Sequence, residues 1–156
     1  MSFPESFARP MIAGMFIYGG LDSFRRPAPK VPAAAGVVEG VTEKTGMDTE
    51  QLVKVIGAVQ VAAGAALALG ILPRPAALAL AASLVPTTLA GHRFWEAEGD
   101  AKPQQTIHFL KNLAMFGGLI IAAASTGGRP SVPWRARRAV QRASETAGDA
   151  IHHLRS

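Results

Sequence analysis

Eight polar or charged side chains lie near the ends of long apolar stretches and are the first candidates for chemistry. They are Asp22, Lys54, His92, Arg93, Glu96, His108, Lys111 and Asn112. On a helix, His108 shares a face with Lys111 and Asn112, and His92 shares one with Glu96. Imidazole groups exchange protons near neutral pH, so His92 and His108 are candidates for proton transfer to a quinone-like ligand.

Two other interpretations of this polar cluster remain open. His92, Glu96 and His108 have the side-chain types of a metal site, which needs at least three converging ligands. Alternatively, the cluster is a structural network of paired charges that fixes the depth of the helices in a membrane. The expected ion pairs are Asp22 with Lys111 or Arg93, and Lys54 with Glu50 or Glu96.

A second candidate site lies deeper in the apolar stretches. Tyr18, Gln60 and Thr87, together with Asn112, are polar residues within segments that are otherwise apolar. If these side chains face the interior of a helix bundle, they predict a binding site for a lipid or a small apolar ligand.

The elements that must position these residues are apolar helices. Residues 55–73, 75–92 and 112–128 carry no formal charge, and each stretch is 17 to 19 residues long. A membrane-spanning helix needs about 17–25 predominantly apolar residues. Adding a first helix with Arg9 and Asp22 at its ends, the sequence predicts an all-α integral membrane four-helix bundle with spans at about 6–24, 51–71, 76–95 and 105–126.

The connections between these helices are also marked in the sequence. Asp48 and Gln51 have the spacing of a capping box at the start of the second helix. Residues 73–75 read Pro-Arg-Pro and predict a tight break between the second and third helices. Three prolines in residues 27–32 favour an extended course in the first loop, followed by a short turn or helix around Val37–Val41.

Composition separates the chain into two parts. The 156 residues contain no cysteine, which excludes disulfides and thiol chemistry on this chain, and only 17% are charged. Of the net charge of +5, residues 129–156 carry +4. We therefore expect a transmembrane domain at 1–128 and a basic cytoplasmic tail at 129–156, with both termini cytoplasmic.

The tail predicts an amphipathic basic helix. Small and apolar residues recur every three or four positions from Ala136 to Leu154, and the arginines lie off that stripe. We expect this helix to contact anionic lipid or a soluble partner rather than nucleic acid. Its candidate contact residues are Arg135, Arg137, Arg138 and Arg142.

Several stretches resemble one known family. "RPMIAGMFIYGGLDSF", "PTTLAGHRFW" and "HFLKNLAMFGGLIIA" resemble the DoxX family, closest to its actinobacterial, mycobacterial-type members, over about residues 9–126. The resemblance implies a multi-pass bacterial inner-membrane protein. It also implies association with an oxidoreductase complex that includes superoxide dismutase and a thiosulfate sulfurtransferase. Many members carry Glu where this chain has Gln60, and an amide cannot release a proton.

These observations lead to one main functional hypothesis and two alternatives. The chain has no motif for a covalently bound cofactor and is not expected to be an enzyme on its own. We expect a membrane subunit that anchors or supports an oxidoreductase or oxidative-stress complex, with quinone as a candidate ligand. The alternatives are a lipid or small apolar ligand-binding protein, and a structural accessory subunit of a larger membrane assembly.

Overall fold

The computed structural model describes residues 3–125, together with positions 138 and 141. This part of the chain is all-helical, which confirms the predicted class. The helices are α1 (Phe3–Arg25), the short 3-10 helix η1 (Ala28–Lys30), α2 (Val31–Thr45), α3 (Thr49–Leu69), α4 (Pro73–Gly91) and α5 (Ala101–Ala124). The predicted tail helix falls almost wholly outside the described residues, as do Arg135, Arg137 and Arg142.

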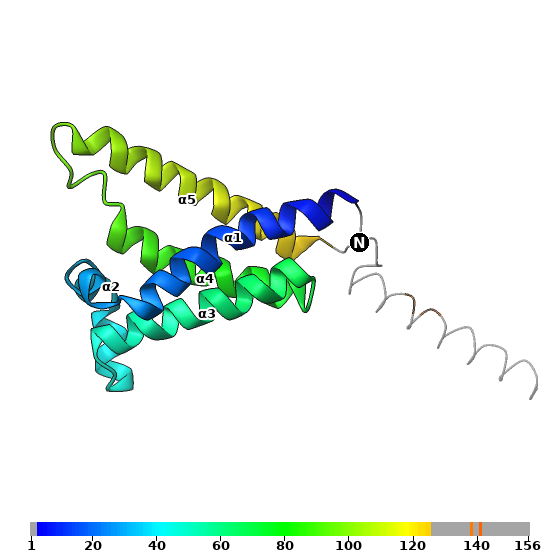
Figure 1. The fold of residues 1–156 in the computed structure, drawn as a ribbon, viewed down its shortest axis with the longest axis horizontal. Coiled ribbons are helices and arrows are strands. Elements are labelled where there is room, and N and C mark those ends of the chain that lie inside the picture. The colour runs from blue at the N-terminus through cyan, green and yellow to red at the C-terminus, as the bar shows by residue number, and fades with distance from the viewer. Residues whose placement is uncertain (1–2, 126–137, 139–140, 142–156) are drawn as a thin grey trace, which may run out of the picture. The chain divides into compact units, whose positions relative to one another are not determined.

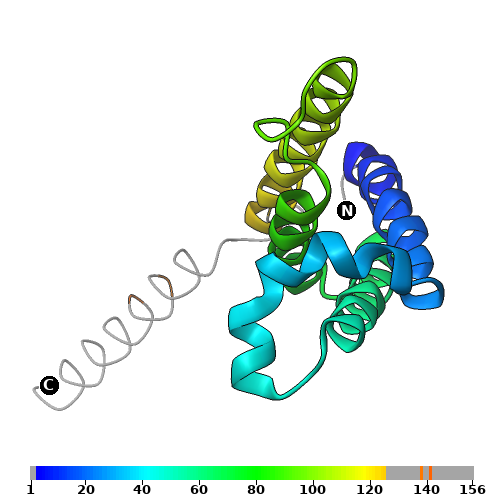
Figure 2. The same cartoon turned by 90° about the vertical axis from the view of Figure 1, so that its left-hand side faces the viewer.

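Helix α1 packs on α3, α3 on α4 and α4 on α5, and α2 lies at one end of these four long helices (Figure 1). Figure 2 looks at that end and shows α2 passing between the ends of the long helices. At the opposite end, Arg74 Nε donates a hydrogen bond to the carbonyl of Ser125 at 3.0 Å. This bond joins the start of α4 to the end of α5, so the two helices are antiparallel.

Residues at the two ends of α3 determine where this helix starts and stops. Asp48 Oδ1 accepts a hydrogen bond from the backbone N–H of Gln51 at 2.7 Å, and Gln51 Oε1 accepts one from the backbone N–H of Asp48 at 3.2 Å. This is the predicted capping box. Gly70 ends the helix in the left-handed conformation with φ of 70°, which glycine adopts at no steric cost.

The loop between the first two long helices is not extended, so that prediction is wrong. Pro27 stands at the start of η1, and Pro32 is the second residue of α2. The first amides of a helix have no partner within it, so proline is well tolerated at these positions. The same prolines that suggest an extended segment therefore begin helices, and α2 runs well beyond the short element expected around Val37–Val41.

The boundaries of α4 and α5 differ from the predicted ones in a way that matters for the site. Pro73 and Pro75 belong to the first turn of α4, and the break before it is made at residues 70–72, where Leu72 has a φ of 47°. The helix ends at Gly91 rather than at residue 95, and α5 begins at Ala101 rather than at 105. His92 and Glu96 therefore do not share a helical face.

Helices α1 and α3 pack with their backbones in close approach. A Cβ atom placed on Gly57 would lie 2.6 Å from the Gly20 carbonyl oxygen, and one on Gly20 would lie 2.7 Å from the Gly57 oxygen. Gly64 lies similarly close to Ile17. Small residues allow such contacts between helices in a membrane, where no hydrophobic force drives association.

The apolar core lies where α3, α4 and α5 meet α1. Leu67, Leu80 and Leu119 are completely buried there and pack with Phe16 and Leu84. Two helices in the described part, α3 and α5, are long and apolar enough to cross a membrane. The predicted spans in α1 and α4 do not meet that criterion.

Candidate functional site

The contact between α4 and α5 contains the two histidines that the sequence singles out. Their rings stack, with centroids 5.0 Å apart and planes inclined by 24°. His92 caps the end of α4, where its backbone amide bonds the Thr88 carbonyl, and its Nδ1 lies 3.0 Å from Gln105 Oε1. The structure therefore brings His92 and His108 of the predicted polar cluster together, and a ring stack between two segments makes the contact.

One buried nitrogen of this histidine pair lacks a hydrogen bond within the described residues. His108 Nδ1 is buried, and no hydrogen bond reaches it from any described residue. A buried polar atom without a partner is uncommon in folded proteins. His108 Nδ1 is thus a candidate for binding a group that the described residues do not supply.

A second polar contact lies one helical turn deeper in the same seam. Asn112 Nδ2 donates a hydrogen bond to Thr88 Oγ1 at 3.0 Å. Asn112 is 7% exposed and Thr88 8%. Because Asn112 follows His108 by four residues and Thr88 precedes His92 by four, the two contacts are successive steps of one seam.

The predicted bundle-interior ligand site is only partly assembled. Gln60 is buried, and its Nε2 donates to Ser83 Oγ at 3.4 Å, linking α3 to α4. Thr87 is half-buried and donates to carbonyls of its own helix. Tyr18 is 79% exposed on α1 and cannot line the interior, because its side chain points out of the bundle.

The charged residues after α4 form a polar pocket with α2. Arg93 Nη1 lies 3.3 Å from Glu96 Oε2, and Arg93 Nη2 donates to the Ala33 carbonyl at 3.4 Å. These groups border a cavity of about 350 Å³ that also includes Gln105. The arginine thus ties the α4–α5 connection to α2, an element that the sequence did not clearly predict.

Three aromatic rings beside this pocket escaped the sequence reasoning. Phe94 packs edge-on against Trp95 and Phe109, with ring centroids 5.2 and 5.1 Å apart, and Trp95 also meets Phe109. The adjacent Phe-Trp pair was the available signal, since aromatic residues gather at membrane interfaces.

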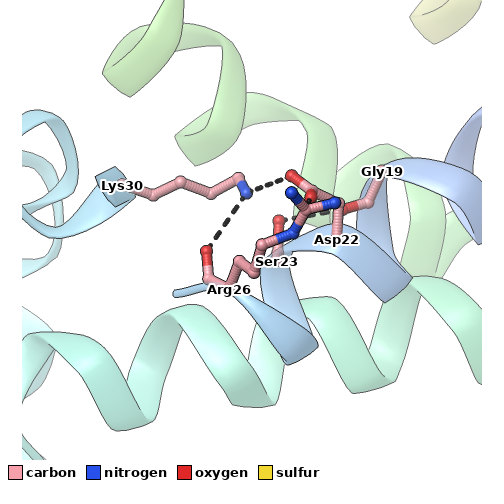
Figure 3. Close-up of polar contacts among 5 residues, drawn as sticks. All are labelled: Gly19, Asp22, Ser23, Arg26 and Lys30. Atoms are coloured by element: carbon pink, nitrogen blue, oxygen red, sulfur yellow. Dashed lines mark hydrogen bonds and ion pairs between the residues drawn. The ribbon is translucent and has the colours of Figure 1, made fainter. Parts of the chain in front are cut away.

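The acidic residue at the end of α1 has different partners from the predicted ones. Asp22 pairs with Lys30 of η1 and with Arg26, not with Lys111 or Arg93 (Figure 3). Figure 3 also shows Ser23 donating to the Gly19 carbonyl. The prediction was wrong because η1 brings Lys30 back toward α1.

The remaining charged candidates are accounted for by local contacts. Lys54 pairs with Glu50 at 2.7 Å, as predicted, while Lys111 is exposed. Among the described residues, no three His, Cys, Asp or Glu side chains come together as metal ligands. The geometry therefore does not support the metal alternative at His92, Glu96 and His108, since Glu96 turns to Arg93.

Comparison with known proteins places this fold in a family. The DoxX family profile matches residues 6–93, more than half of the chain. The chain is also 29% identical over 108 residues to the inner membrane protein YphA of Escherichia coli K12, covering 69% of this chain and 76% of YphA. No solved structure matches the chain. The narrower resemblance to actinobacterial members stays a prediction, but the match over α1 to α4 shows that this chain belongs to the DoxX family of membrane proteins.

Proposed function

We propose that this chain is a four-span inner-membrane subunit that anchors soluble oxidoreductase partners and does not itself catalyse their reaction. Family membership and the similarity to an inner-membrane protein support the location. The apolar side chains outside the helices and the polar pairs between them support the number of spans. The absence of cysteine supports a partner as the site of any thiol reaction.

The observation that carries this proposal is the exposure of apolar side chains on all four long helices. Buried polar pairs such as Gln60–Ser83 and Asn112–Thr88 lie inside, whereas large apolar side chains lie outside. Soluble proteins rarely expose contiguous apolar surface of this kind. The exposed side chains include Met11, Met15, Val55, Val59, Leu78, Val85, Leu89, Ile107, Leu110, Leu113, Ile120 and Ile121.

The lengths of α1 and α4 fit this proposal as well. At about 1.5 Å per residue, the 19 residues of α4 extend about 28 Å and the 23 residues of α1 about 34 Å. The hydrocarbon core is about 30 Å thick. Two polar residues of α4 are accommodated by the neighbouring helices, because Thr88 and Ser83 have partners on α5 and α3.

The proposed orientation places α2 and the α4–α5 connection on one side of the membrane. The α3–α4 turn, with Arg74, lies on the other side, together with both termini. The six arginines after residue 128 favour the cytoplasm for that side, since basic residues are retained there.

The absence of cysteine makes this topology directly testable with single introduced thiols. Ala35→Cys in α2 and Glu98→Cys after α4 are expected to react with a membrane-impermeant maleimide in spheroplasts. Ile71→Cys, between α3 and α4, is expected to react only after permeabilisation. Equal labelling of all three in intact spheroplasts would contradict four spans.

The partner role rests on the family resemblance together with the chain's own chemistry. Without cysteine, this chain cannot supply a thiol, so any thiol reaction takes place on a partner. We propose superoxide dismutase and a sulfurtransferase as the soluble partners, recruited by the basic tail, with a membrane quinone as the linked electron carrier.

Native purification tests the partner role. The full chain, extracted from native membranes, is expected to retain these enzymes, and replacing Arg135, Arg137, Arg138 and Arg142 by Gln is expected to release them. Replacing Arg25 and Arg26 by Gln is the matched control and should release nothing. Recovery of the chain without either enzyme would reject the anchoring role.

A further inference from the structure

An apolar groove lies between α4 and α5 on the outside of the bundle. It has a volume of about 210 Å³, and its walls include Leu84, Leu89, Phe109, Leu113 and Phe116. Leu89 and Leu113 are exposed, Leu113 by 55%. The groove is therefore open on the face where the proposed function places lipid.

The floor of this groove is polar at one point. Asn112 and Thr88 both line it, and each is more than nine-tenths buried. In their mutual hydrogen bond, the Asn112 amide donates from its nitrogen end, Nδ2, and Thr88 Oγ1 accepts. The other end of the amide is the oxygen Oδ1. Within the described residues, neither the other end of the amide nor the Thr88 hydroxyl proton has a hydrogen-bond partner.

This unused capacity distinguishes Thr88 from its neighbour. Thr87 donates its hydroxyl proton to the carbonyls of Ser83 and Leu84 and so is satisfied by its own helix. No water is available in a hydrocarbon environment to form the missing hydrogen bonds of Asn112 and Thr88. An acyl chain cannot form them either, because it carries no donor or acceptor.

We propose that this groove binds a lipid-soluble ring bearing a hydroxyl group, a phenol-like molecule. A hydroxyl is both donor and acceptor and matches the free amide end and the free Thr88 proton together. The size also fits, since a cavity of about 150 Å³ holds benzene and this groove is somewhat larger. The ring lies against Phe109 and Phe116 and reaches the groove laterally from the bilayer.

This site differs from the interior site that the sequence suggests. It shares Asn112 with that site but uses Thr88 in place of Tyr18, Gln60 and Thr87, and it faces lipid. It also requires no partner enzyme, so it stands or fails separately from the anchoring role.

Photolabelling of the full chain in lipid vesicles tests the proposal. The probes are a phenol carrying a diazirine and the same diazirine-bearing ring without the hydroxyl. The phenol probe is expected to label α4 and α5 at the groove about tenfold more strongly, the ratio that one net hydrogen bond of about 1.4 kcal/mol provides.

Two variants and one matched control make the outcome decisive. Thr88→Val keeps the side-chain shape and is expected to reduce labelling by the phenol toward the level of the hydroxyl-free ring, because only the bond to Asn112 then remains. Asn112→Leu should act in the same direction. Thr87→Val removes a neighbouring hydroxyl that is already satisfied and should leave labelling unchanged. Equal labelling by both probes, or undiminished phenol labelling of Thr88→Val, would overturn the proposal.

Discussion

The imidazole rings of His92 and His108 stack at 5.0 Å, although 16 positions separate them in the chain. The stack closes the α4–α5 hairpin immediately beyond the last turn of α4, one turn above the hydrogen bond between Asn112 and Thr88. The seam between these helices is thus joined by two consecutive polar contacts, in a region where α5 has few other buried side chains.

The stack should be measurable as a coupling energy. In a double-mutant cycle of His92→Ala and His108→Ala, we expect the two substitutions to be non-additive by about 0.5–1.5 kcal/mol, the usual contribution of a packed ring pair. The free energy of unfolding in detergent is the quantity to measure.

The control for this cycle uses an exposed residue of the same helix. Lys111 is exposed, so Lys111→Ala combined with His92→Ala should be additive to within about 0.5 kcal/mol. Additivity of the two histidine substitutions would show that the rings do not interact in solution.

The close approach of α1 and α3 makes a second prediction. Gly57→Ala places a methyl group 2.6 Å from the Gly20 carbonyl oxygen, so the helices must separate. We expect a loss of about 1–3 kcal/mol in thermal stability measurements, as for other overpacked contacts.

Gly19→Ala is the matched substitution for this test. A Cβ on Gly19 meets nothing within 4 Å, so the variant should be unchanged or more stable by up to about 1 kcal/mol. A destabilisation equal to that of Gly57→Ala would mean that the close approach of Gly57 to Gly20 is not the cause of the loss, since a Cβ on Gly19 meets no other atom.

The parts of the fold that were predictable are those that depend on neighbouring residues. The capping box of Asp48 and Gln51 is complete within four positions, and the pair Glu50–Lys54 within one turn. The prolines of residues 27–32 were misinterpreted because proline both disfavours helix interiors and begins helices. Which role applies depends on the packing of α2 against α3 and α4, which no local pattern encodes.

The candidate site was predictable in its residues but not in their partners. His92 and His108 were identified from their position near the ends of apolar segments. Asp22 was assigned the wrong partner because Lys30 approaches it only once η1 has formed. The pairing of Asn112 with Thr88 depends on the register of two antiparallel helices, which a one-residue change in either helix end would shift.

The buried pair Gln60–Ser83 supports a third prediction. Ser83→Ala leaves the Gln60 amide without its hydrogen-bond partner on α4, and we expect a loss of about 1–2 kcal/mol in unfolding free energy. Adding Gln60→Leu to that variant should recover most of the loss, because an apolar side chain of similar size needs no partner. Failure of Gln60→Leu to improve the Ser83→Ala variant would mean that the amide is satisfied elsewhere.

The capping box at the start of α3 gives the last prediction. Asp48→Ala removes the acceptor for the Gln51 amide and should lower the unfolding free energy by about 1 kcal/mol. Asp100 stands at the equivalent position before α5, but its side chain accepts no capping hydrogen bond. Asp100→Ala should therefore change stability by much less, and circular dichroism during thermal unfolding compares the two variants. Equal losses would mean that the charge at a helix start, and not the hydrogen bond, stabilises α3.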